Sequence, residues 1–413
     1  MKIKKCVVSE GRTGYYLDDK HAIQDGAKLD GNYYFGKPKT EGFKAIRQAG
    51  ESVSIMLVLE DGQVGYGDCA TGQYSGIGGR DKPFFSKEIK SYINKEIKPK
   101  LEGMELDNFR ETASDVESWI INGERLHTGV AYGITQALLD GVAKIKKMTM
   151  AEVIAKEYGT KLAKERIPIF IQSGDDRYIG ADKGIMKRAE VIPHSLINRV
   201  EGLTGKNAEG LYKYAIWLKN RIQEIGEKDY FPIIHLDVYG TIGYAFNQDI
   251  NKVVPYIKKL EEAVKPYPLQ LEMPMDMGSK QATMETFKKM KEMFKKEGIR
   301  TKVVVDEWAN NLAQIKEWAD SKAAGIIQVK TIDVGGINRI IEAIIYCKAK
   351  GVGAYLGGTC NETDISARVC ANIAIATQPD QMLAKPGMGV DEGYMIVYNE
   401  MMRVLALIES RKN

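Results

Sequence analysis

Between residues 167 and 385 the chain alternates short apolar segments with longer amphipathic ones, and this alternation constrains the fold more than any other feature. The apolar segments are predicted strands: IPIFIQ (167–172), FPIIHLDV (231–238), LQLEM (269–273), TKVVVDE (301–307), GIIQVK (325–330), GVGAYL (351–356) and QMLAK (381–385). Predicted helices separate most of them, at 209–227, 249–265, 280–297, 310–321, 336–350 and 362–377. Repeated strand–helix units of this kind build parallel sheets.

The spacing of these segments predicts the number of strands. From the second predicted strand to the last, the strands start at positions 231, 269, 301, 325, 351 and 381, which suits one strand–helix unit each. The interval between the first two starts, at positions 167 and 231, is too long for one helix and two loops. It leaves room for a further unit, with a weak strand near Val191 to His194. Eight parallel strands in succession favour a closed (β/α)8 TIM barrel over an open sheet.

The chain before the barrel has a different character, with mixed strands and helices. Residues 52–67 hold two β-branched runs joined at Asp61-Gly62, which is a strong hairpin signal. Within 127–146 apolar residues recur every fourth position, at Val130, Ile134, Leu138 and Val142, and predict a helix with one buried face. Because 413 residues are long for one domain, we predict an α+β domain over 1–160 and the barrel over 161–413.

The composition excludes several classes of protein. Apolar residues make up 44% of the chain and charged residues 28%, enough for a large core and a solvated surface. The net charge of +4 comes from 59 basic and 55 acidic residues that are mixed along the chain, which predicts neither a nucleic-acid nor a membrane partner. Five scattered cysteines indicate no disulfide framework. The sequence shows no secretory signal and no apolar run of spanning length, so we expect a cytoplasmic protein.

Polar residues stand where the predicted strands end, and in a (β/α)8 barrel those positions carry the reactive side chains. They are Gln172, His194, Asp237, Glu272, Asp306 with Glu307, Gln328 with Lys330, and Thr359 with Cys360. Asp237, Glu272 and Asp306 end consecutive predicted strands, so one strand–helix unit separates each acid from the next. The three carboxylates should therefore converge at the mouth of the barrel.

Three converging carboxylates need a cation. Without one they repel each other and some must take up protons. A hard dication that prefers oxygen ligands, above all Mg²⁺, removes this repulsion and leaves positions open for water and substrate. The alternative is that each acid is an ordinary loop residue or helix N-cap, which explains a single acid better than three at consecutive strand ends.

Two further residues are candidates for proton transfer. Lys330 ends an apolar strand beside the acids, where a nearby dication and desolvation would lower its pKa and allow it to act as a general base. The alternative for Lys330 is a salt bridge. His194, one of four histidines, falls on the opposite side of the predicted mouth, and a structural histidine is as good an interpretation for it.

Acids on strands three, four and five, with candidate bases on strands two and six, resemble the enolase superfamily, whose members join an α+β capping domain to a modified barrel. The finer motifs resemble one family within it, the methylaspartate ammonia-lyases (3-methylaspartases). The matching stretches are GDCATGQYSGIGGRD (67–81), IQSGDDRY (171–178), HLDVYGTIG (235–243), DEWAN (306–310), IIQVKT (326–331), GGTCNET (357–363) and LAKPGMGVDEG (383–393). They occur in the right order across both predicted domains.

The resemblance implies a role for each site residue. The Mg²⁺ ligands would be Asp237, Glu272 and Asp306. Lys330 would be the base acting on the 3S centre, and His194 would face it as the second acid/base or electrophilic group. The substrate's carboxylates and amine would be bound by Gln73, Gln172, His194, Gln328, Thr359 and Cys360, and Leu383 would contact its methyl group.

The sequence departs from the family pattern at Met273, where many members carry glycine, and we expect this side chain to crowd the mouth of the pocket. Family members are typically homodimers and often need a monovalent cation such as K⁺ in addition to Mg²⁺. The resemblance therefore implies a homodimer and a monovalent-cation requirement for this chain as well.

The reaction implied is the reversible loss of ammonia from (2S,3S)-3-methylaspartate to give mesaconate, as in glutamate fermentation, through Mg-assisted removal of the C3 proton and an enediolate. One alternative is another activity of the superfamily, such as an acid-sugar dehydratase, an epimerase or a cycloisomerase. Those enzymes usually carry KxK on strand two or a His–Asp pair near strand seven, and neither pattern occurs here. A binding barrel without catalysis is the other alternative, and the presence of both candidate bases and all three acids argues against it.

Overall fold

The computed structural model describes residues 1–76, 79–388 and 390–411, so Ile77, Gly78 and Gly389 of the matching motifs lie outside it. The N-terminal part contains an antiparallel sheet in the order β1 (Ile3–Asp18), β4 (Arg47–Leu59) and β5 (Val64–Ala70). Strands β4 and β5 form the predicted hairpin. Gly62 in its turn has φ +86°, a backbone conformation that glycine adopts without steric penalty.

Helix α5 (Thr128–Ile145) confirms the predicted amphipathic helix, and Val130, Ile134, Leu138 and Val142 are fully buried. It crosses β5 at very short range: a Cβ added to Gly67 would lie 2.1 Å from the Gly133 carbonyl oxygen. The other elements of this part are α1 (Lys20–Gln24), β2 (Lys28–Asp30), β3 (Tyr33–Phe35), α2 (Ser86–Tyr92), the π-helix η1 (Ile93–Ile97), α3 (Lys98–Leu101), α4 (Phe109–Ser118), β6 (Ile120–Ile121), β7 (Glu124–Arg125) and α6 (Met150–Tyr158).

The C-terminal part is a closed barrel of eight parallel strands, in the order β10–β11–β12–β13–β14–β15–β8–β9. The strands are β8 (Ile169–Phe170), β9 (Val191–His194), β10 (Ile233–Asp237), β11 (Leu269–Glu272), β12 (Lys302–Val305), β13 (Ile326–Val329), β14 (Gly353–Leu356) and β15 (Gln381–Leu383). Each predicted strand is present, including the weak one at 191–194. The predicted fold class, a modified TIM barrel preceded by an α+β domain, is confirmed.

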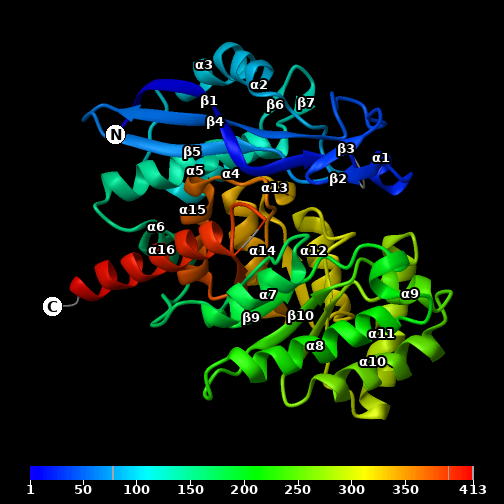
Figure 1. Ribbon diagram of the computed structural model, residues 1–413. Coiled ribbons are helices and arrows are strands. Elements are labelled where there is room, and N and C mark those ends of the chain that lie inside the picture. The colour runs from blue at the N-terminus through cyan, green and yellow to red at the C-terminus, as the bar shows by residue number, and fades with distance from the viewer. Residues whose placement is uncertain (77–78, 389, 412–413) are drawn as a thin grey trace.

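Helices cover the outside of the barrel: α7 (Arg177–Met186), α8 (Glu209–Ile225), α10 (Ile250–Val264), α11 (Lys280–Glu297), α12 (Leu312–Ser321), α14 (Ile337–Ala349), α15 (Asp364–Thr377) and α16 (Asp391–Ser410). The short helices α9 (Thr241–Ala245) and α13 (Thr331–Val334) follow strands β10 and β13 directly. In Figure 1 the N-terminal sheet lies on one side of the molecule, and α5 is placed between this sheet and helices α13 and α15 of the barrel.

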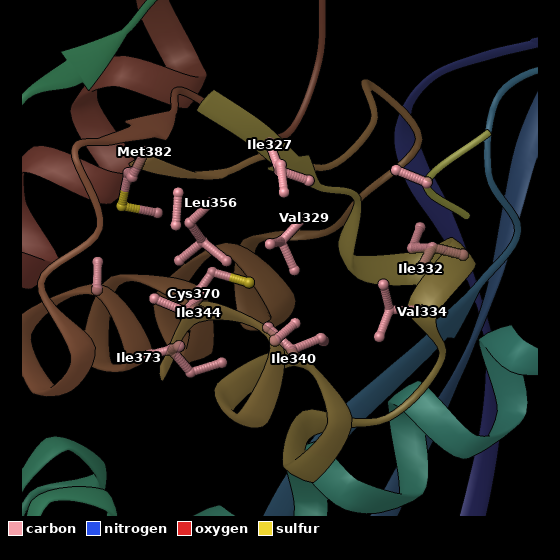
Figure 2. Packing of buried hydrophobic residues seen from close by; sticks show 14 of the residues in the cluster. Ile327, Val329, Ile332, Val334, Ile340, Ile344, Leu356, Cys370, Ile373 and Met382 are labelled. Atoms are coloured by element: carbon pink, nitrogen blue, oxygen red, sulfur yellow. The ribbon is translucent and has the colours of Figure 1, made fainter. Parts of the chain in front are cut away.

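The barrel strands separate two apolar layers. Figure 2 shows Ile327 and Val329 of β13 on the outer layer, together with Leu356 of β14 and residues of α14 and α15. The inner layer comprises Phe170, Val191, Val304, Ile326, Tyr355 and Leu383. The carboxyl ends of the strands lie beyond this inner layer and can carry polar groups. None of the helices in the described ranges is long and apolar enough to cross a membrane.

Candidate active site

One cavity at the carboxyl ends of the barrel strands brings the predicted site residues together. Its lining includes Gln73, Gln172, His194, Asp237, Asp306, Gln328, Lys330, Thr359, Cys360 and Leu383. Gln73 comes from the loop after β5, so the N-terminal part contributes to the wall. Glu272 is the one predicted residue that does not line the cavity. It is fully buried, and its Oε1 accepts a hydrogen bond of 2.6 Å from Nε2 of Gln328, which does.

The three acids stand at neighbouring strand ends, as their spacing predicts. Asp237 and Glu272 are the last residues of β10 and β11, and Asp306 follows β12. All three are at most 4% exposed. Burial raises the pKa of Asp237 well above its usual range, and the charges of Glu307 and Asp306 raise it further. Burial also raises the pKa of Glu272 well above its usual range, and the charges of Asp237 and Asp306 raise it further. The acids therefore repel one another, which is the condition that a bound cation relieves.

The donor set fits Mg²⁺, although the side chains are not gathered into a ready-made cluster. No group of three or more His, Cys, Asp or Glu residues in the described part of the chain is arranged to hold a metal ion. Each acid instead contacts a neighbour: Asp237 lies 3.4 Å from His194, Glu272 lies 2.9 Å from His235, and Asp306 lies 2.7 Å from Lys330. Oδ1 of Asp306, however, is buried without a hydrogen-bond partner among the described residues. Oxygen donors, mutual repulsion and an orphaned carboxylate oxygen suit a hard dication.

Lys330 follows β13 and its ammonium is paired with Asp306. The Nζ–Oδ2 distance is 2.7 Å, and the two side chains are 16% and 5% exposed. Burial by itself lowers the pKa of Lys330, but the negative charges of Asp306, Asp333 and Glu307 together outweigh it, and the pKa lies above its ordinary value. The expectation from the sequence was a lowered pKa, with a salt bridge as the alternative. The structure shows the salt bridge, and the amine is not neutral while this pair persists.

His194 ends β9 on the far side of the barrel. In the closed order three strands separate β9 from β13 in each direction, so His194 and Lys330 face each other across the mouth. Burial lowers the pKa of His194 to about 4, and the charge of Lys330 contributes in the same direction while that of Asp306 opposes it. The imidazole is therefore neutral at neutral pH.

Left-handed backbone surrounds the site. Tyr239 (φ +48°), Met273 (φ +47°) and Trp308 (φ +66°) each lie one or two residues beyond an acid of the trio. Residues 194–196 are also left-handed, at φ +72°, +75° and +49°. Such conformations are unfavourable for residues other than glycine and cluster at functional sites, where the surrounding packing enforces them.

Met273 does not crowd the pocket, contrary to the expectation from the sequence. Its side chain is 1% exposed and packs in the main hydrophobic core, outside the lining of the cavity. The turn after Glu272 directs the side chain away from the mouth. The backbone of Met273 is strained in this position, because φ +47° is a conformation that glycine would adopt more easily.

The remaining predicted residues form the wall between the two parts of the chain. The backbone N–H of Gln73 donates to Oγ1 of Thr359 over 3.1 Å, and its Oε1 accepts from Nδ2 of Asn361 over 2.9 Å. Burial raises the pKa of Cys360 to about 12, so it remains a neutral thiol. Leu383 belongs to the inner apolar layer and closes the cavity from below with Tyr355.

Sequence reasoning missed several lining residues: Tyr74, Leu196, Tyr239, Tyr355, Gly358 and Met388. Most of them stand one or two positions from a predicted residue, so the strand-end rule could have included them. Tyr355 is different, because it points inward from within β14. Only the alternation of inward and outward residues along that strand could have found it.

Nearly the whole chain matches family models of methylaspartate ammonia-lyase, the N-terminal model over residues 1–159 and the C-terminal model over 161–410. It is 52% identical to methylaspartate ammonia-lyase 2 of Carboxydothermus hydrogenoformans, over 100% of this chain and 99% of that protein. The crystal structure of the Mg complex of β-methylaspartase from Clostridium tetanomorphum is 52% identical, covers 100% of both chains and has a TM-score of 0.96.

A further crystal structure, methylaspartate ammonia-lyase of Citrobacter amalonaticus containing (2S,3S)-3-methylaspartic acid, is 45% identical, covers 99% of this chain and 100% of that chain, and has a TM-score of 0.97. The likeness thus extends over the full length of the chain, through both the barrel and the part that precedes it. The chain belongs to the methylaspartate ammonia-lyase family of carbon–nitrogen lyases.

Proposed function

We propose that this chain catalyses the reversible elimination of ammonia from (2S,3S)-3-methylaspartate to give mesaconate. The observation that carries the proposal is the pairing of Lys330 and His194 across one buried cavity whose wall also holds Asp237 and Asp306. The Citrobacter amalonaticus relative, whose crystal structure contains the same amino acid, supports the choice of substrate.

Asp237, Glu272 and Asp306 would hold Mg²⁺, which the Clostridium tetanomorphum relative contains in its crystal structure. When bound, Mg²⁺ offsets the negative charge that develops on the substrate carboxylate as the neighbouring C3 proton leaves. The three acids suit this task because they are buried, and because the charge of Asp306 raises the pKa values of both Asp237 and Glu272. Ionising all of them requires a positive partner that the chain supplies only in part, through Lys330.

Lys330 would take the C3 proton of the 3S centre, leaving a dianionic enediolate from which the C2 amine departs. For this the lysine must be neutral, whereas Asp306 stabilises its charged form. Once Asp306 serves the metal site, burial is the main remaining influence on Lys330, and burial lowers its pKa. The two roles of Asp306 thus connect metal binding to the readiness of the base.

His194 would act on the opposite face of C3, as a neutral imidazole. Its Nε2 lies 3.4 Å from Oδ2 of Asp237 and its Nδ1 accepts from the backbone N–H of Leu196, which requires the proton to reside on Nε2. In this tautomer His194 offers a hydrogen-bond donor to the substrate side. It would therefore orient or polarise the substrate with the 3S epimer. To take the C3 proton of the 3R epimer at Nε2, the imidazole would first have to lose the bond between Nδ1 and the Leu196 N–H and adopt the other tautomer, with its proton on Nδ1.

The substrate would be held by groups that do not compete for the metal. Neutral amides of Gln73, Gln172 and Gln328, with the hydroxyl of Thr359 and the thiol of Cys360, would bind the carboxylates and the amine. Leu383 would contact the C3 methyl group, since it belongs to the apolar layer below the cavity. Neutral binding groups of this kind gain specificity from hydrogen bonds that an ill-fitting substrate leaves unmade.

The direct test is ultraviolet detection of the conjugated product. With (2S,3S)-3-methylaspartate and Mg²⁺, absorbance should rise, stop when a chelator is added, and resume when Mg²⁺ is restored in excess. Absence of any rise would contradict the lyase proposal. Absorbance that continues to rise in excess chelator would contradict the metal site but not the lyase reaction.

Four further features stay predictions that follow from the family resemblance and the sequence. They are a domain boundary between residues 160 and 161, a homodimer, a monovalent-cation requirement such as K⁺, and a cytoplasmic location. Size-exclusion chromatography with light scattering tests the dimer, and activity assays with K⁺ exchanged for tetramethylammonium test the monovalent cation.

A further inference from the structure

A fully buried ion pair lies beside the cavity without lining it. Lys385 follows β15 and Glu362 lies between β14 and α15, and Nζ and Oε1 are 3.0 Å apart. Both side chains are 0% exposed. A buried ion pair is rarely the most stable solution, because apolar side chains of the same volume often serve stability as well or better. The pair therefore calls for an explanation other than stability.

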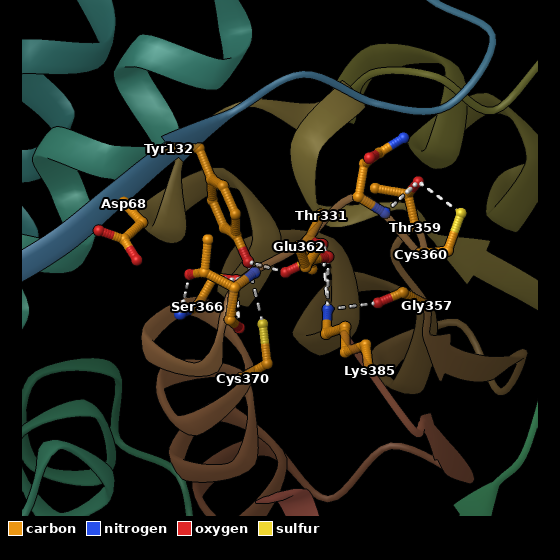
Figure 3. Close-up of polar contacts among 12 residues, drawn as sticks. Asp68, Tyr132, Thr331, Gly357, Thr359, Cys360, Glu362, Ser366, Cys370 and Lys385 are labelled. Carbon is orange, nitrogen blue, oxygen red and sulfur yellow. Dashed lines mark hydrogen bonds and ion pairs between the residues drawn. The ribbon is translucent and has the colours of Figure 1, made fainter. Parts of the chain in front are cut away.

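The hydrogen bonds of the pair are complete (Figure 3). Nζ of Lys385 donates to the carbonyl oxygen of Gly357 over 2.8 Å, to Oγ1 of Thr331 over 3.1 Å and to Glu362. Thr331 in turn donates to Oε1 of Glu362 over 2.7 Å, and the hydroxyl of Tyr132 donates to Oε2 over 2.9 Å. Each ammonium proton and each carboxylate oxygen has a partner. A satisfied buried network of this kind is rigid and holds the segments it joins in one arrangement.

The pair sets the position of the Gly357-Gly358 segment. A Cβ added to Gly358 would lie 2.4 Å from Oε1 of Glu362 and 2.6 Å from Nζ of Lys385. One added to Gly357 would lie 2.6 Å from Cγ of Gln328, on the cavity side. The segment is thus held between the buried pair and the cavity wall. Thr359 and Cys360 follow it directly and line the cavity, so their position depends on the pair.

The network has two further connections. Thr331 is the residue after Lys330 and begins α13, so its bonds to Glu362 and Lys385 fix the backbone of the candidate base. Tyr132 belongs to α5, which packs against the N-terminal sheet. Through the hydroxyl of Tyr132, the N-terminal part donates a hydrogen bond to Glu362, the carboxylate of the buried pair. Burial lowers the pKa of Lys385, but Cys370 and Glu362 outweigh it and keep the ammonium charged.

We propose that Lys385 and Glu362 are positioning residues, fastened by Tyr132, that hold the 357–360 loop in the geometry in which the dicarboxylate substrate binds. The inference rests on the proposed function for its substrate, but the ordering of the loop does not depend on the reaction. Mispositioning the loop should affect substrate binding more than proton transfer, because Thr359 and Cys360 belong to the loop, whereas Lys330 follows β13.

Tyr132→Phe is the mildest test, because it removes one hydroxyl and leaves the ring buried. Tyr256→Phe is the matched control: it also removes a buried hydroxyl bond, of 2.8 Å to the Ala208 carbonyl, and Tyr256 does not line the cavity. Tyr132→Phe should raise KM for (2S,3S)-3-methylaspartate about tenfold, the scale of one hydrogen bond to a charged group, and change kcat by no more than about twofold. The control should leave both constants unchanged at a similar loss of thermal stability.

Hydrogen–deuterium exchange of the peptide covering 357–363, without substrate, gives a readout that does not depend on catalysis. Exchange should be faster in Tyr132→Phe than in wild type and unchanged in Tyr256→Phe. The double variant Lys385→Met/Glu362→Gln removes both charges together, so neither is left unpaired, and should accelerate exchange in the same peptide and raise KM further.

The two proposals fail in different ways. Wild-type protein without lyase activity would refute the proposed function, and the exchange data would still decide whether the network orders the loop. If exchange of 357–363 and KM in Tyr132→Phe both match the control, while the melting temperature falls equally in the two variants, the network is purely structural and the inference is overturned.

Discussion

Asp306→Asn should abolish most of the stabilisation that Mg²⁺ gives to the folded protein. The substitution keeps the size of the side chain and removes one of three charged oxygen donors. Altering a partner of a metal ligand typically weakens binding ten- to hundredfold, so losing a direct ligand should cost at least about a hundredfold in affinity. Oδ1 of Asp306, buried without a partner among the described residues, is the oxygen that this prediction assigns to the ion.

The magnitude follows from mass action. At a Mg²⁺ concentration about a hundred times the wild-type Kd, binding stabilises the folded state by about 2.7 kcal/mol, and after a hundredfold loss of affinity by only about 0.4 kcal/mol. For a chain of this length these energies correspond to increases in melting temperature of about 3 °C and below about 1 °C. The shift on adding Mg²⁺ is the quantity to compare. Absolute melting temperatures also change, because the substitution removes both a partner of Lys330 and a charge that raises the pKa of Glu272.

The assay is thermal unfolding followed by circular dichroism, with and without Mg²⁺, in wild type, Asp306→Asn and Glu307→Gln. Glu307 is the adjacent acid, lines the same cavity and is not in the predicted ligand set, so it controls for loss of general negative charge. The Mg²⁺-dependent shift should persist in Glu307→Gln and collapse in Asp306→Asn. The reverse pattern, or equal shifts in all three proteins, would refute the assignment.

Four further variants test the pocket, the turn and a buried acid. Gln172→Ala should raise KM about ten- to hundredfold at nearly constant kcat, for a lost hydrogen bond to a carboxylate of about 1.5–3 kcal/mol. Gln328→Ala should also lower kcat, because Gln328 donates to Glu272; unchanged kinetics in both would show that these amides do not touch substrate. Met273→Gly should leave KM unchanged but lower the free energy of unfolding by roughly 1–4 kcal/mol in urea titrations, since lost burial exceeds the relieved backbone strain; a changed KM would place this side chain in the pocket after all. Burial raises the pKa of Glu117 from 4.5 to about 7 against the opposing charge of Arg339. The folded protein therefore holds a proton that the unfolded chain releases, and between about pH 4.5 and 7 stability should fall with rising pH relative to Glu117→Gln; parallel urea midpoints for the two proteins would contradict this.

The strands and the site could be predicted from the sequence because a barrel couples them. The alternation of segments predicts eight strands. The positions at the ends of those strands then predict Asp237, Glu272 and Lys330 as site residues, without any knowledge of distances. Even the short strand at 191–194 followed from the length of chain left between its neighbours. Local periodicity and unit spacing carry this information, and both are visible in one sequence.

Contacts between distant parts of the chain could not be predicted in the same way. Lys385 ends a predicted strand in the same manner as Lys330, yet its partners lie elsewhere, Glu362 in the preceding loop and Tyr132 in α5, 230 residues before Glu362. The raised pKa of Lys330 depends on a 2.7 Å contact that no spacing rule supplies. The outward turn of Met273 depends on its left-handed backbone. Each of these requires three-dimensional distances or dihedral angles.

The central claim is that Lys330 and His194 act on opposite faces of C3, and kcat/KM for the 3S and 3R epimers of 3-methylaspartate tests it most directly. Lys330→Gln is the variant of choice, because an amide still offers a donor to Asp306 while it cannot act as a base. It should lower kcat/KM for the 3S epimer by about a hundredfold or more, the scale of losing a general base. His194→Gln should harm the 3R epimer more than the 3S epimer, and the ratio of the two values within each variant cancels errors in active-enzyme concentration. Equal losses on both epimers in both variants would contradict the assignment of the two residues to opposite faces.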